Sequence, residues 1–513
     1  MMTFQNRFVL LLGLAALLAV ISLSLQFFRL IPLPVGFYGE EEAKPRKRVL
    51  IDGLLKAPQA LDPITESVYY CNRPNGSVQG LEGHAPVGFK LEAAHIMIRH
   101  GDRYPLYAIP NAAALNIDCN IRTDRAPFHR ALEGFVAHMA QAREGRFDGP
   151  LAGFPLLPSH PRCEMGQLTQ TGVVQHLMIG QHLRQTYSDL HGLLLKHESE
   201  AERVRAAYVE STGRARTLQS ALALLYGLRP AFDWSRLRVH HQPSASYCYA
   251  ACECPARSAF QELDQRRQSR ARSRDPQLAR AFRDMASALD VPPARLRAAV
   301  PVDPLLAHFC HGVPFPCASS SSSPSPLLPP QRSGCVSEQH FRTLRAQQLV
   351  DEKERKEAGL FRRFALLVMH PFLNRTAQRL GAVAAGKPAE RLALYSAHDV
   401  TLEPALSALG LAGARFPRYA ARLVFELWRK EDKGRLAGGA DVGGHFIRVL
   451  YNGEDVTFKT AFCQNHDWKR GTGSLLCPFQ KFLDFVSRDM FAPFNSTSYY
   501  EACHHIPQPD ADM

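Results

Sequence analysis

The sequence lacks several patterns that would assign it to common enzyme classes. It has no glycine-rich loop of the P-loop type, which argues against a kinase or a nucleotide-hydrolysing enzyme. No segment repeats at a fixed period, so a repeat architecture is not expected. Cysteine and histidine do not occur at the paired spacings of zinc sites, which disfavours a zinc hydrolase. Charged residues make up only 21% and hydrophobic residues 46%, values typical of a globular protein rather than a disordered one.

Positive charge is nevertheless in excess. The formal net charge is +13 over 513 residues. Such a charge attracts partners of opposite charge over long distances, but it does not predict the fold. Nucleic acid, an anionic membrane, and a sulfated or phosphorylated glycan are all compatible with this positive charge as binding partners. Arginines are concentrated from Gln265 to Arg283. This segment is either a solvated helix face or a patch that holds an acidic glycan.

The N-terminus contains one long apolar run, from Phe8 to Phe28. A run of about 20 apolar residues matches the hydrocarbon thickness of a bilayer. Arg7 would also suit a cleaved signal peptide, but the run exceeds the usual hydrophobic region and no small-residue cleavage site follows. We therefore expect an uncleaved signal anchor over residues 8–28, preceded by a cytoplasmic tail of residues 1–7.

Two features favour a lumenal location for the body of the chain. Three N-glycosylation acceptors, at Asn75, Asn374 and Asn495, are meaningful only in the lumen. Twelve cysteines, an even number, suit an oxidising compartment. The basic residues between Lys44 and Arg48 weaken a simple positive-inside argument. We predict a single-pass type II protein with its tail in the cytosol and its body in the lumen.

Composition divides the rest of the chain into a stem and a body. Residues 29–85 are rich in proline and glycine without sustained periodicity, which predicts a lumenal stem that acts as a tether. Residues 86–503 form the predicted catalytic domain, with an inserted, mostly helical cap at roughly 249–385, and residues 504–513 form a tail. The Ser- and Pro-rich stretch Ala318–Gly334 predicts a flexible surface loop. Three cysteines are expected to staple its base: Cys310, Cys317 and Cys335.

Strand and helix patterns alternate along the body. Leu91–Ile98 and Leu392–Ser396 are apolar and β-branched, as in buried strands. Leu168–Tyr187 and Thr217–Leu225 have apolar residues at helical spacing, and Val400–Leu409 continues this pattern after the second strand. This alternation predicts an α/β protein with a three-layer α/β/α sandwich.

The first chemical motif follows the first predicted strand. It reads Arg99-His100-Gly101-Asp102-Arg103-Tyr104-Pro105. In open α/β sheets, ligands bind beyond the carboxyl ends of strands. Guanidinium groups form paired hydrogen bonds with phosphate oxygens. A neutral imidazole between two guanidinium groups is placed to attack phosphorus. The alternative interpretation is a surface-exposed basic turn, and the tripeptide Arg-His-Gly alone would not exclude it. Gly101 is expected to permit a sharp turn of the backbone.

The second motif, His398-Asp399, follows the second predicted strand and precedes a helix. A carboxylic acid can protonate the departing oxygen of a phosphate ester, and a nearby phosphate would raise its proton affinity. Asp399 fits that role, and His398 is placed to hydrogen-bond the phosphate. The alternative is a helix N-terminus with an aspartate near the cap.

These motifs, together with Arg216-Thr217, resemble the histidine acid phosphatases in type and order. The resemblance implies that His100 forms a phosphohistidine and that Asp399 is the proton donor. It also implies that phosphate is bound by four side chains: Arg99, Arg103, Arg216 and His398. Arg216 is preferred to Arg214 on this resemblance alone. No cofactor, no metal and no nucleic acid is expected.

Within this family, the sequence resembles a branch of Golgi type II enzymes that remove the 2-phosphate of xylose from the glycosaminoglycan–protein linkage region. This resemblance extends from Arg7 to Cys503, apart from much of the stem and the loop near Ser319–Pro330. It implies three partners: the phosphorylated linkage oligosaccharide on its core protein, a linkage-region glycosyltransferase such as a glucuronosyltransferase, and the Golgi membrane.

Three other interpretations remain. A broad-specificity lysosomal or secreted acid phosphatase would share the motifs, but a cleavable signal would suit it better than an anchor. An inactive glycan-binding relative would be favoured by a replaced nucleophile, which is not seen. A metal hydrolase would use the irregular Cys/His clusters, which are better explained by disulfides. Those clusters are Cys248, Cys252 and Cys254, and His308, Cys310 and His311.

Overall fold

A computed structural model of the chain divides into two units, residues 1–60 and 61–513. The described residues all belong to the second unit: 62–74, 78–84, 87–142, 145–160, 163–193, 207–318, 334–431, 444–464 and 476–506. The predicted tail and anchor, much of the predicted stem, Asn75 and most of the Ser- and Pro-rich stretch lie outside these ranges. No helix within them is both long and apolar enough to cross a membrane.

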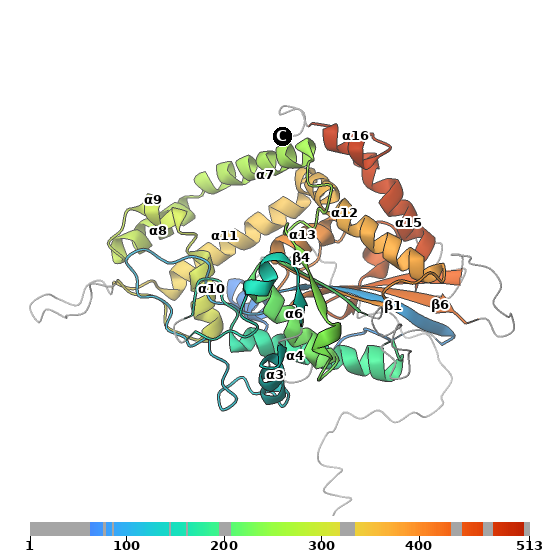
Figure 1. Ribbon diagram of the computed structural model, residues 1–513. Coiled ribbons are helices and arrows are strands. Elements are labelled where there is room, and N and C mark those ends of the chain that lie inside the picture. The colour runs from blue at the N-terminus through green and yellow to red at the C-terminus, as the bar shows by residue number, and fades with distance from the viewer. Residues whose placement is uncertain are drawn as a thin grey trace, which may run out of the picture. The chain divides into compact units, whose positions relative to one another are not determined.

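A mixed nine-stranded sheet forms the centre of the described part of the chain (Figure 1). Its order is β2-β4-β3-β5-β1-β6-β7-β8, and β9 pairs with β7. Strands β1 to β5 are mutually parallel, whereas β6 to β9 run antiparallel to their neighbours. The carboxyl ends of β1, β5 and β3 therefore meet at one edge. The strands are β1 Phe89–Arg99, β2 Arg146–Phe147, β3 Ala207–Thr212, β4 Arg238–Gln242, β5 Leu392–Ala397, β6 Arg422–Lys430, β7 His445–Tyr451, β8 Glu454–Asp455 and β9 Cys477–Pro478.

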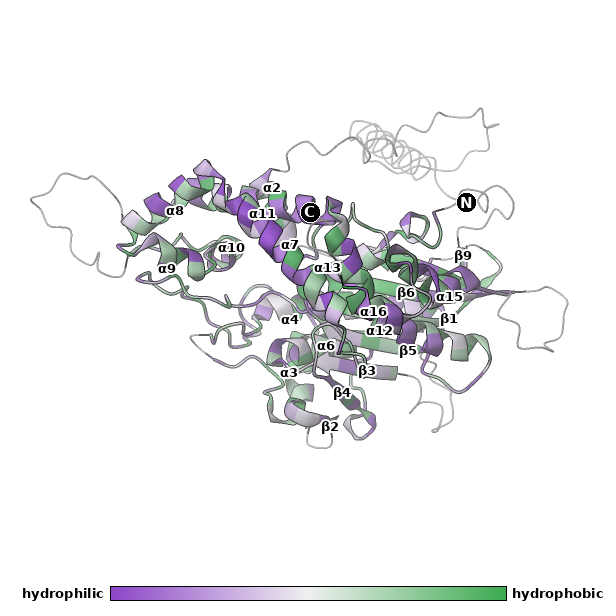
Figure 2. Ribbon diagram, turned by 90° about the horizontal axis from the view of Figure 1, so that it is seen from above, coloured by the Kyte–Doolittle hydropathy of each residue, from purple (hydrophilic) through white to green (hydrophobic). Residues whose placement is uncertain are grey.

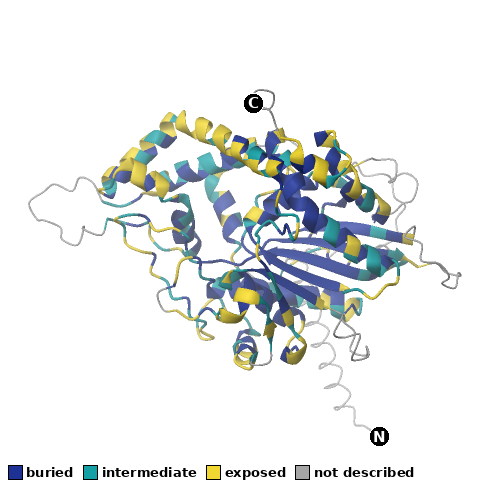
Figure 3. Ribbon diagram, turned by 45° about the horizontal axis from the view of Figure 1, so that its top comes forward, coloured by how far each residue is buried: buried dark blue, intermediate teal, exposed yellow. Residues whose placement is uncertain are grey.

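Helices cover both faces of this sheet, which confirms the predicted three-layer arrangement. One apolar core joins the sheet to α12, α13 and α15, and a second joins its other face to α3, α4 and α6 (Figure 1). All six residues of β5 are buried, as a central parallel strand requires. Figure 3 shows that most of the sheet is buried. These helices are α3 Leu132–Met139, α4 Gln170–Leu183, α6 Ala215–Leu228, α12 Gly359–Ala384, α13 Asp399–Ala408 and α15 Phe479–Ser487.

A group of helices beside the sheet has a separate apolar core of its own, to which α8, α9, α10 and α11 contribute. Figure 2 shows α7 and α11 as largely hydrophilic helices. Helix α12 lies within the range predicted for the cap, yet it packs on the sheet. The helices are α7 Pro255–Ser273, α8 Pro276–Ala288, α9 Pro293–Ala298, α10 Val302–His311 and α11 Glu338–Glu357. The remaining helical segments are α2 Pro63–Cys71, η3 Gly149–Gly153, η4 Arg184–Leu190, η5 Trp234–Arg236, η7 Thr457–Lys459, η8 Asp489–Phe494 and α16 Tyr499–His504.

Six disulfides pair all twelve cysteines, as expected for an oxidising compartment. They are Cys71–Cys310, Cys119–Cys163, Cys248–Cys252, Cys254–Cys503, Cys317–Cys335 and Cys463–Cys477. The expected staple at the Ser- and Pro-rich stretch is made by Cys317 and Cys335, whereas Cys310 is bonded to Cys71 instead. Because every cysteine of the irregular clusters is bonded to another, none supplies a thiolate for zinc.

Within the stretch predicted as a tether, residues 62–74 contain a helix that packs onto the domain. Asp62 caps α2 by accepting a hydrogen bond from the Thr65 amide, and Pro63 occupies the first helical turn. Glu66 forms an ion pair with Arg415, at 2.6 Å. The short length of α2 hides its periodicity in the sequence, and its stability comes from these distant contacts.

A pair of glycines brings α4 against the loop that follows β1. A Cβ on Gly101 would lie 2.5 Å from the Gly172 Cα, and a Cβ on Gly172 would lie 2.4 Å from the Asp102 carbonyl oxygen. Thr169 caps α4 and donates a hydrogen bond to the Asp102 carboxylate at 2.5 Å. Gly101 has no positive φ. The explanation predicted for Gly101 was therefore wrong: close packing, rather than a sharp turn, requires glycine there.

We expect Gly172→Ala to lower the free energy of unfolding by about 2 kcal/mol or more, because the new methyl group overpacks against backbone. Urea denaturation measures this change. The matched control is Gly381→Ala in α12, where nothing lies within 4 Å of the new Cβ. That substitution should be neutral or stabilise by up to about 1 kcal/mol. Equal effects of the two substitutions would contradict the packing argument.

Candidate active site

The predicted site residues gather where three parallel strands end. Strand β1 is paired in register with β5, and β5 with β3, so their carboxyl ends lie side by side. Five predicted residues stand at or just beyond these ends: Arg99 and His100 at β1, Arg216 in the first turn of α6 after β3, and His398 and Asp399 after β5. The sixth, Arg103, follows in the loop after His100. We call residues 99–106 the motif loop.

His100 is almost fully buried, with 2% of its surface exposed. Its Nδ1 lies 2.8 Å from the Gly101 carbonyl oxygen. Since a carbonyl only accepts, Nδ1 carries the hydrogen, and Nε2 keeps its lone pair. Burial, and then the charges of Arg216 and Arg99, hold the pKa of His100 well below its ordinary value. The ring is therefore neutral, and it lies 5.5 Å from the ring of His398.

Arg99 is the most enclosed of the three arginines, with no exposed side-chain surface. Its Nη2 contacts both the Asp399 carboxylate, at 2.7 Å, and the Tyr70 hydroxyl, at 2.8 Å. Its Nη1 donates a hydrogen bond to the Pro417 carbonyl at 2.7 Å. The Tyr419 ring lies 4.6 Å from the guanidinium. Tyr70 belongs to the stretch predicted as a tether, and no local pattern marks it as a partner of Arg99.

Arg103 is held by an aspartate from α10. Its Nη2 and Nη1 lie 2.8 and 3.5 Å from the two carboxylate oxygens of Asp303, and Nη1 also donates to the Tyr104 carbonyl. Asp303 in turn accepts a hydrogen bond from the Leu106 amide, at 2.7 Å. Asp303 could not be identified from the sequence, because 200 residues separate it from Arg103 and nothing in its neighbours indicates a phosphate site.

Arg216 completes a group of three guanidiniums. Burial, and then the charges of Arg103 and other arginines, lower the pKa of Arg216 to about 10, which leaves it protonated at neutral pH. Within the described part of the chain, its Nε has no hydrogen-bond acceptor, and the same is true of the Nε atoms of Arg99 and Arg103. Buried N–H groups without acceptors favour an anion that can accept from them. A phosphate group fits this arrangement.

His398 and Asp399 lie on the β5 side of the site. The His398 Nε2 is 2.8 Å from the Thr212 hydroxyl, a contact that the sequence analysis missed. Burial and neighbouring arginines lower the pKa of His398. Asp399 accepts from the Val400 amide at 2.8 Å, and although burial raises its pKa, the charge of Arg99 and its neighbours leaves that pKa below the ordinary value. The predicted rise in proton affinity concerns a site that holds phosphate, and it stays a prediction.

Comparison with known proteins identifies the family. The sequence profile of the histidine phosphatase superfamily, branch 2, matches residues 90–452, which include all six predicted site residues. The chain belongs to this superfamily.

Three relatives illustrate the similarity. The human protein named 2-phosphoxylose phosphatase 1 is 48% identical over 98% of this chain and 99% of its own length. Bovine lysosomal acid phosphatase is 30% identical over 53% of this chain and 61% of its own. A solved structure of a Bifidobacterium longum multiple inositol polyphosphate phosphatase covers 82% of this chain and 98% of its own, with 14% identity and a TM-score of 0.47.

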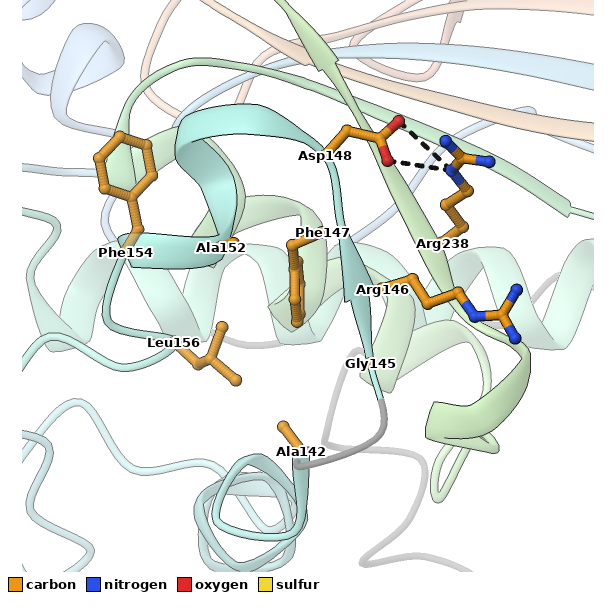
Figure 4. A pocket seen from close by; sticks show the side chains of 9 residues that line it. All are labelled: Ala142, Gly145, Arg146, Phe147, Asp148, Ala152, Phe154, Leu156 and Arg238. Carbon is orange, nitrogen blue, oxygen red and sulfur yellow. Dashed lines mark hydrogen bonds and ion pairs between the residues drawn. The ribbon is translucent and has the colours of Figure 1, made fainter.

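A separate cavity of about 600 Å³ lies at the β2 edge of the sheet (Figure 4). Phe147, Phe154 and Leu156 supply its apolar lining, and Arg238 is paired with Asp148 at 3.0 Å on its rim. None of the six predicted site residues lines it. The position of this cavity therefore does not bear on the chemistry of the motif loop.

The other predicted sites are surface features. Several arginines of α7 are exposed, yet Arg266 pairs with Glu262 and Arg272 with Asp351, so part of their charge is offset locally. Asn495 is exposed in a turn after η8, whereas Asn374 is half-buried within α12. Glycosylation at these positions stays a prediction.

We expect inorganic phosphate to stabilise the folded protein, because it would accept hydrogen bonds from the three arginines of the site. At a concentration of 100 times its dissociation constant, the gain would be about 2.7 kcal/mol, measurable as a rise in the unfolding temperature. Arg216→Ala should largely remove this rise. Arg238→Ala, an exposed arginine at the other cavity, should retain it; a loss in both variants would indicate non-specific binding.

Proposed function

We propose that the protein is a phosphomonoester hydrolase that acts through a phosphohistidine on His100. The observation that carries this proposal is the convergence of a neutral buried histidine with the buried guanidiniums of Arg99 and Arg103 and the half-buried guanidinium of Arg216 at the carboxyl ends of β1, β5 and β3. A neutral imidazole is a nucleophile, and guanidiniums stabilise charge on the transferring phosphoryl group. Family membership supports the same chemistry.

The proposed reaction has two displacements at phosphorus. The Nε2 lone pair of His100 attacks the phosphorus, the ester P–O bond breaks, and the proton of Asp399 passes to the departing sugar oxygen. Water then attacks the phosphohistidine, transfers a proton to Asp399 and releases inorganic phosphate with His100 restored. Arg99, Arg103 and Arg216 would hold the phosphoryl oxygens throughout, and no metal is needed for either step.

The charge on Asp399 must change for it to act as the donor. Arg99 contacts this carboxylate at 2.7 Å and favours its ionised form. A bound phosphate dianion would offset the charge of Arg99 and add repulsion of its own, and both effects raise the proton affinity of Asp399. We infer that substrate binding itself prepares the acid.

For the substrate, we propose the 2-phosphate of xylose in the glycosaminoglycan–protein linkage region. Support comes from the identity of 48% to a protein named 2-phosphoxylose phosphatase 1, which extends over nearly the full length of both chains. The net charge of +13 suits a polyanionic glycan. A linkage-region glycosyltransferase, such as a glucuronosyltransferase, is the proposed protein partner.

For the location, we propose the Golgi membrane, with residues 8–28 as the anchor and the catalytic domain in the lumen. The apolar run from Phe8 to Phe28 and the six disulfides support this proposal. Glycosylation at Asn75, Asn374 and Asn495 would follow from it.

The substrate proposal is tested by offering the purified protein a phosphoxylose linkage oligosaccharide, phytate and an aryl phosphate. We expect the highest kcat/KM for the linkage oligosaccharide, and activity in the presence of EDTA. His100→Ala should abolish both turnover and covalent labelling, because it removes the Nε2 lone pair that attacks phosphorus. Preference for phytate would refute the substrate but not the mechanism; labelling that persists in the variant would refute the nucleophile.

We expect Asp399→Asn to slow hydrolysis of sugar phosphates by about 10²- to 10⁴-fold, since the alcohol then departs without a general acid. An activated aryl phosphate should be slowed far less, because its leaving group needs little protonation. The dependence of kcat on leaving-group pKa measures the difference. Equal slowing of both classes would rule out Asp399 as the donor.

A further inference from the structure

Helix α10 lies against the motif loop at both of its ends. At its first turn, Asp303 contacts Arg103 and the Leu106 amide. At its last residue, His311 lies 3.0 Å from the Asp102 carboxylate. The inserted helices therefore reach the loop that carries the proposed nucleophile through two separate contacts.

Asp303 occupies one edge of the Arg103 guanidinium. The carboxylate meets the two Nη atoms, at 2.8 and 3.5 Å, and so takes the end-on edge. The Nε at the side edge keeps its hydrogen without an acceptor. Little of either side chain is exposed, 5% for Arg103 and 15% for Asp303, so water competes weakly for the pair. One edge is thus occupied by protein, and the other remains open to an anion.

The backbone around Asp303 is well anchored. Cys310 of α10 is bonded to Cys71 of α2, and the Arg73 side chain donates to the carbonyls of Phe309 and Cys310, both at 2.8 Å. These contacts hold the C-terminal end of α10, while Asp303 holds the other end to the loop. A carboxylate on such a support is fixed in place before substrate arrives.

A fixed carboxylate also reduces the repulsion among the positive charges of the site. Arg99, Arg103 and Arg216 repel one another in a buried space, and Arg99 already has Asp399 as its counter-charge. Asp303 is the corresponding counter-charge of Arg103, and its Oδ1 lies 2.8 Å from the Arg103 Nη2. Without Asp303, the long side chain of Arg103 would turn away from its neighbours or toward solvent.

We propose that Asp303 is a positioning residue that holds the Arg103 guanidinium edge-on to the phosphate, so that the inserted helices complete the phosphate site. The proposal rests on the phosphatase activity proposed above and adds a residue from α10 to it. Asp303 touches Arg103 and the Leu106 amide, and acts through them.

The test compares Asp303→Asn with the wild-type protein in two assays, hydrolysis of an aryl phosphate and calorimetric binding of inorganic phosphate. We expect KM and the phosphate dissociation constant to rise together by about 10-fold or more, with kcat changed by less than about threefold, because Arg103 binds phosphate in substrate and transition state alike. Asp284→Asn, an exposed position of α8, is the matched control and should change neither.

A double-mutant cycle separates positioning from general support of the fold. In an Arg103→Ala background, Asp303→Asn should have almost no further effect on phosphate binding, because Asp303 acts through Arg103. If Asp303→Asn does not fold, Asp303→Glu serves in its place. Its carboxylate is displaced by one methylene, and a rise of about threefold in the phosphate dissociation constant is expected.

Three results would overturn the proposal: unchanged phosphate binding in the Asp303 variants, tighter binding, which would make Asp303 a competitor of phosphate, or additive effects in the cycle. A wild-type protein that binds phosphate but hydrolyses no ester would instead refute the proposed function. In that case the calorimetric comparison still tests Asp303.

Discussion

The parallel pairing of β1 with β5 and of β5 with β3 is the constraint on which the site depends. In this register Arg99 lies opposite Ala397, and Ser211 lies opposite Ser396, so three chain segments leave the sheet at the same level. The His100 amide continues the ladder by donating to the Ala397 carbonyl at 3.0 Å. Since a shift by one residue would turn every side chain of a strand to the other face, this register decides which groups meet.

The site that results concentrates positive charge where water is scarce. Burial disfavours an imidazolium, and the surrounding guanidiniums disfavour it further, so His100 and His398 remain neutral. Each of two arginines is balanced by a carboxylate from a different part of the fold, Asp399 from α13 and Asp303 from α10. The same set of charges thus keeps His100 neutral and would attract the anion of the proposed substrate.

The sequence predicted the strand–motif–helix units well, because apolar strands and helix caps are local patterns. The strands predicted at Leu91–Ile98 and Leu392–Ser396 correspond to β1 and β5. It misjudged α2 and the role of Gly101, since both depend on contacts with distant segments. The local charge on Asp399 also depends on tertiary structure, because it is set by Arg99.

The sequence by itself determined the chemistry of the site: which residue types are present, and at which strand ends they stand. Only the tertiary structure decided which of them are paired, because Arg99 bonds to Tyr70 and Pro417, 29 and 318 residues away, and Arg103 bonds to Asp303, 200 residues away. The same holds for the disulfide that joins α2 to α10 across 239 residues. Periodicity and motif spacing report on near neighbours, whereas packing of the folded chain selects the distant ones.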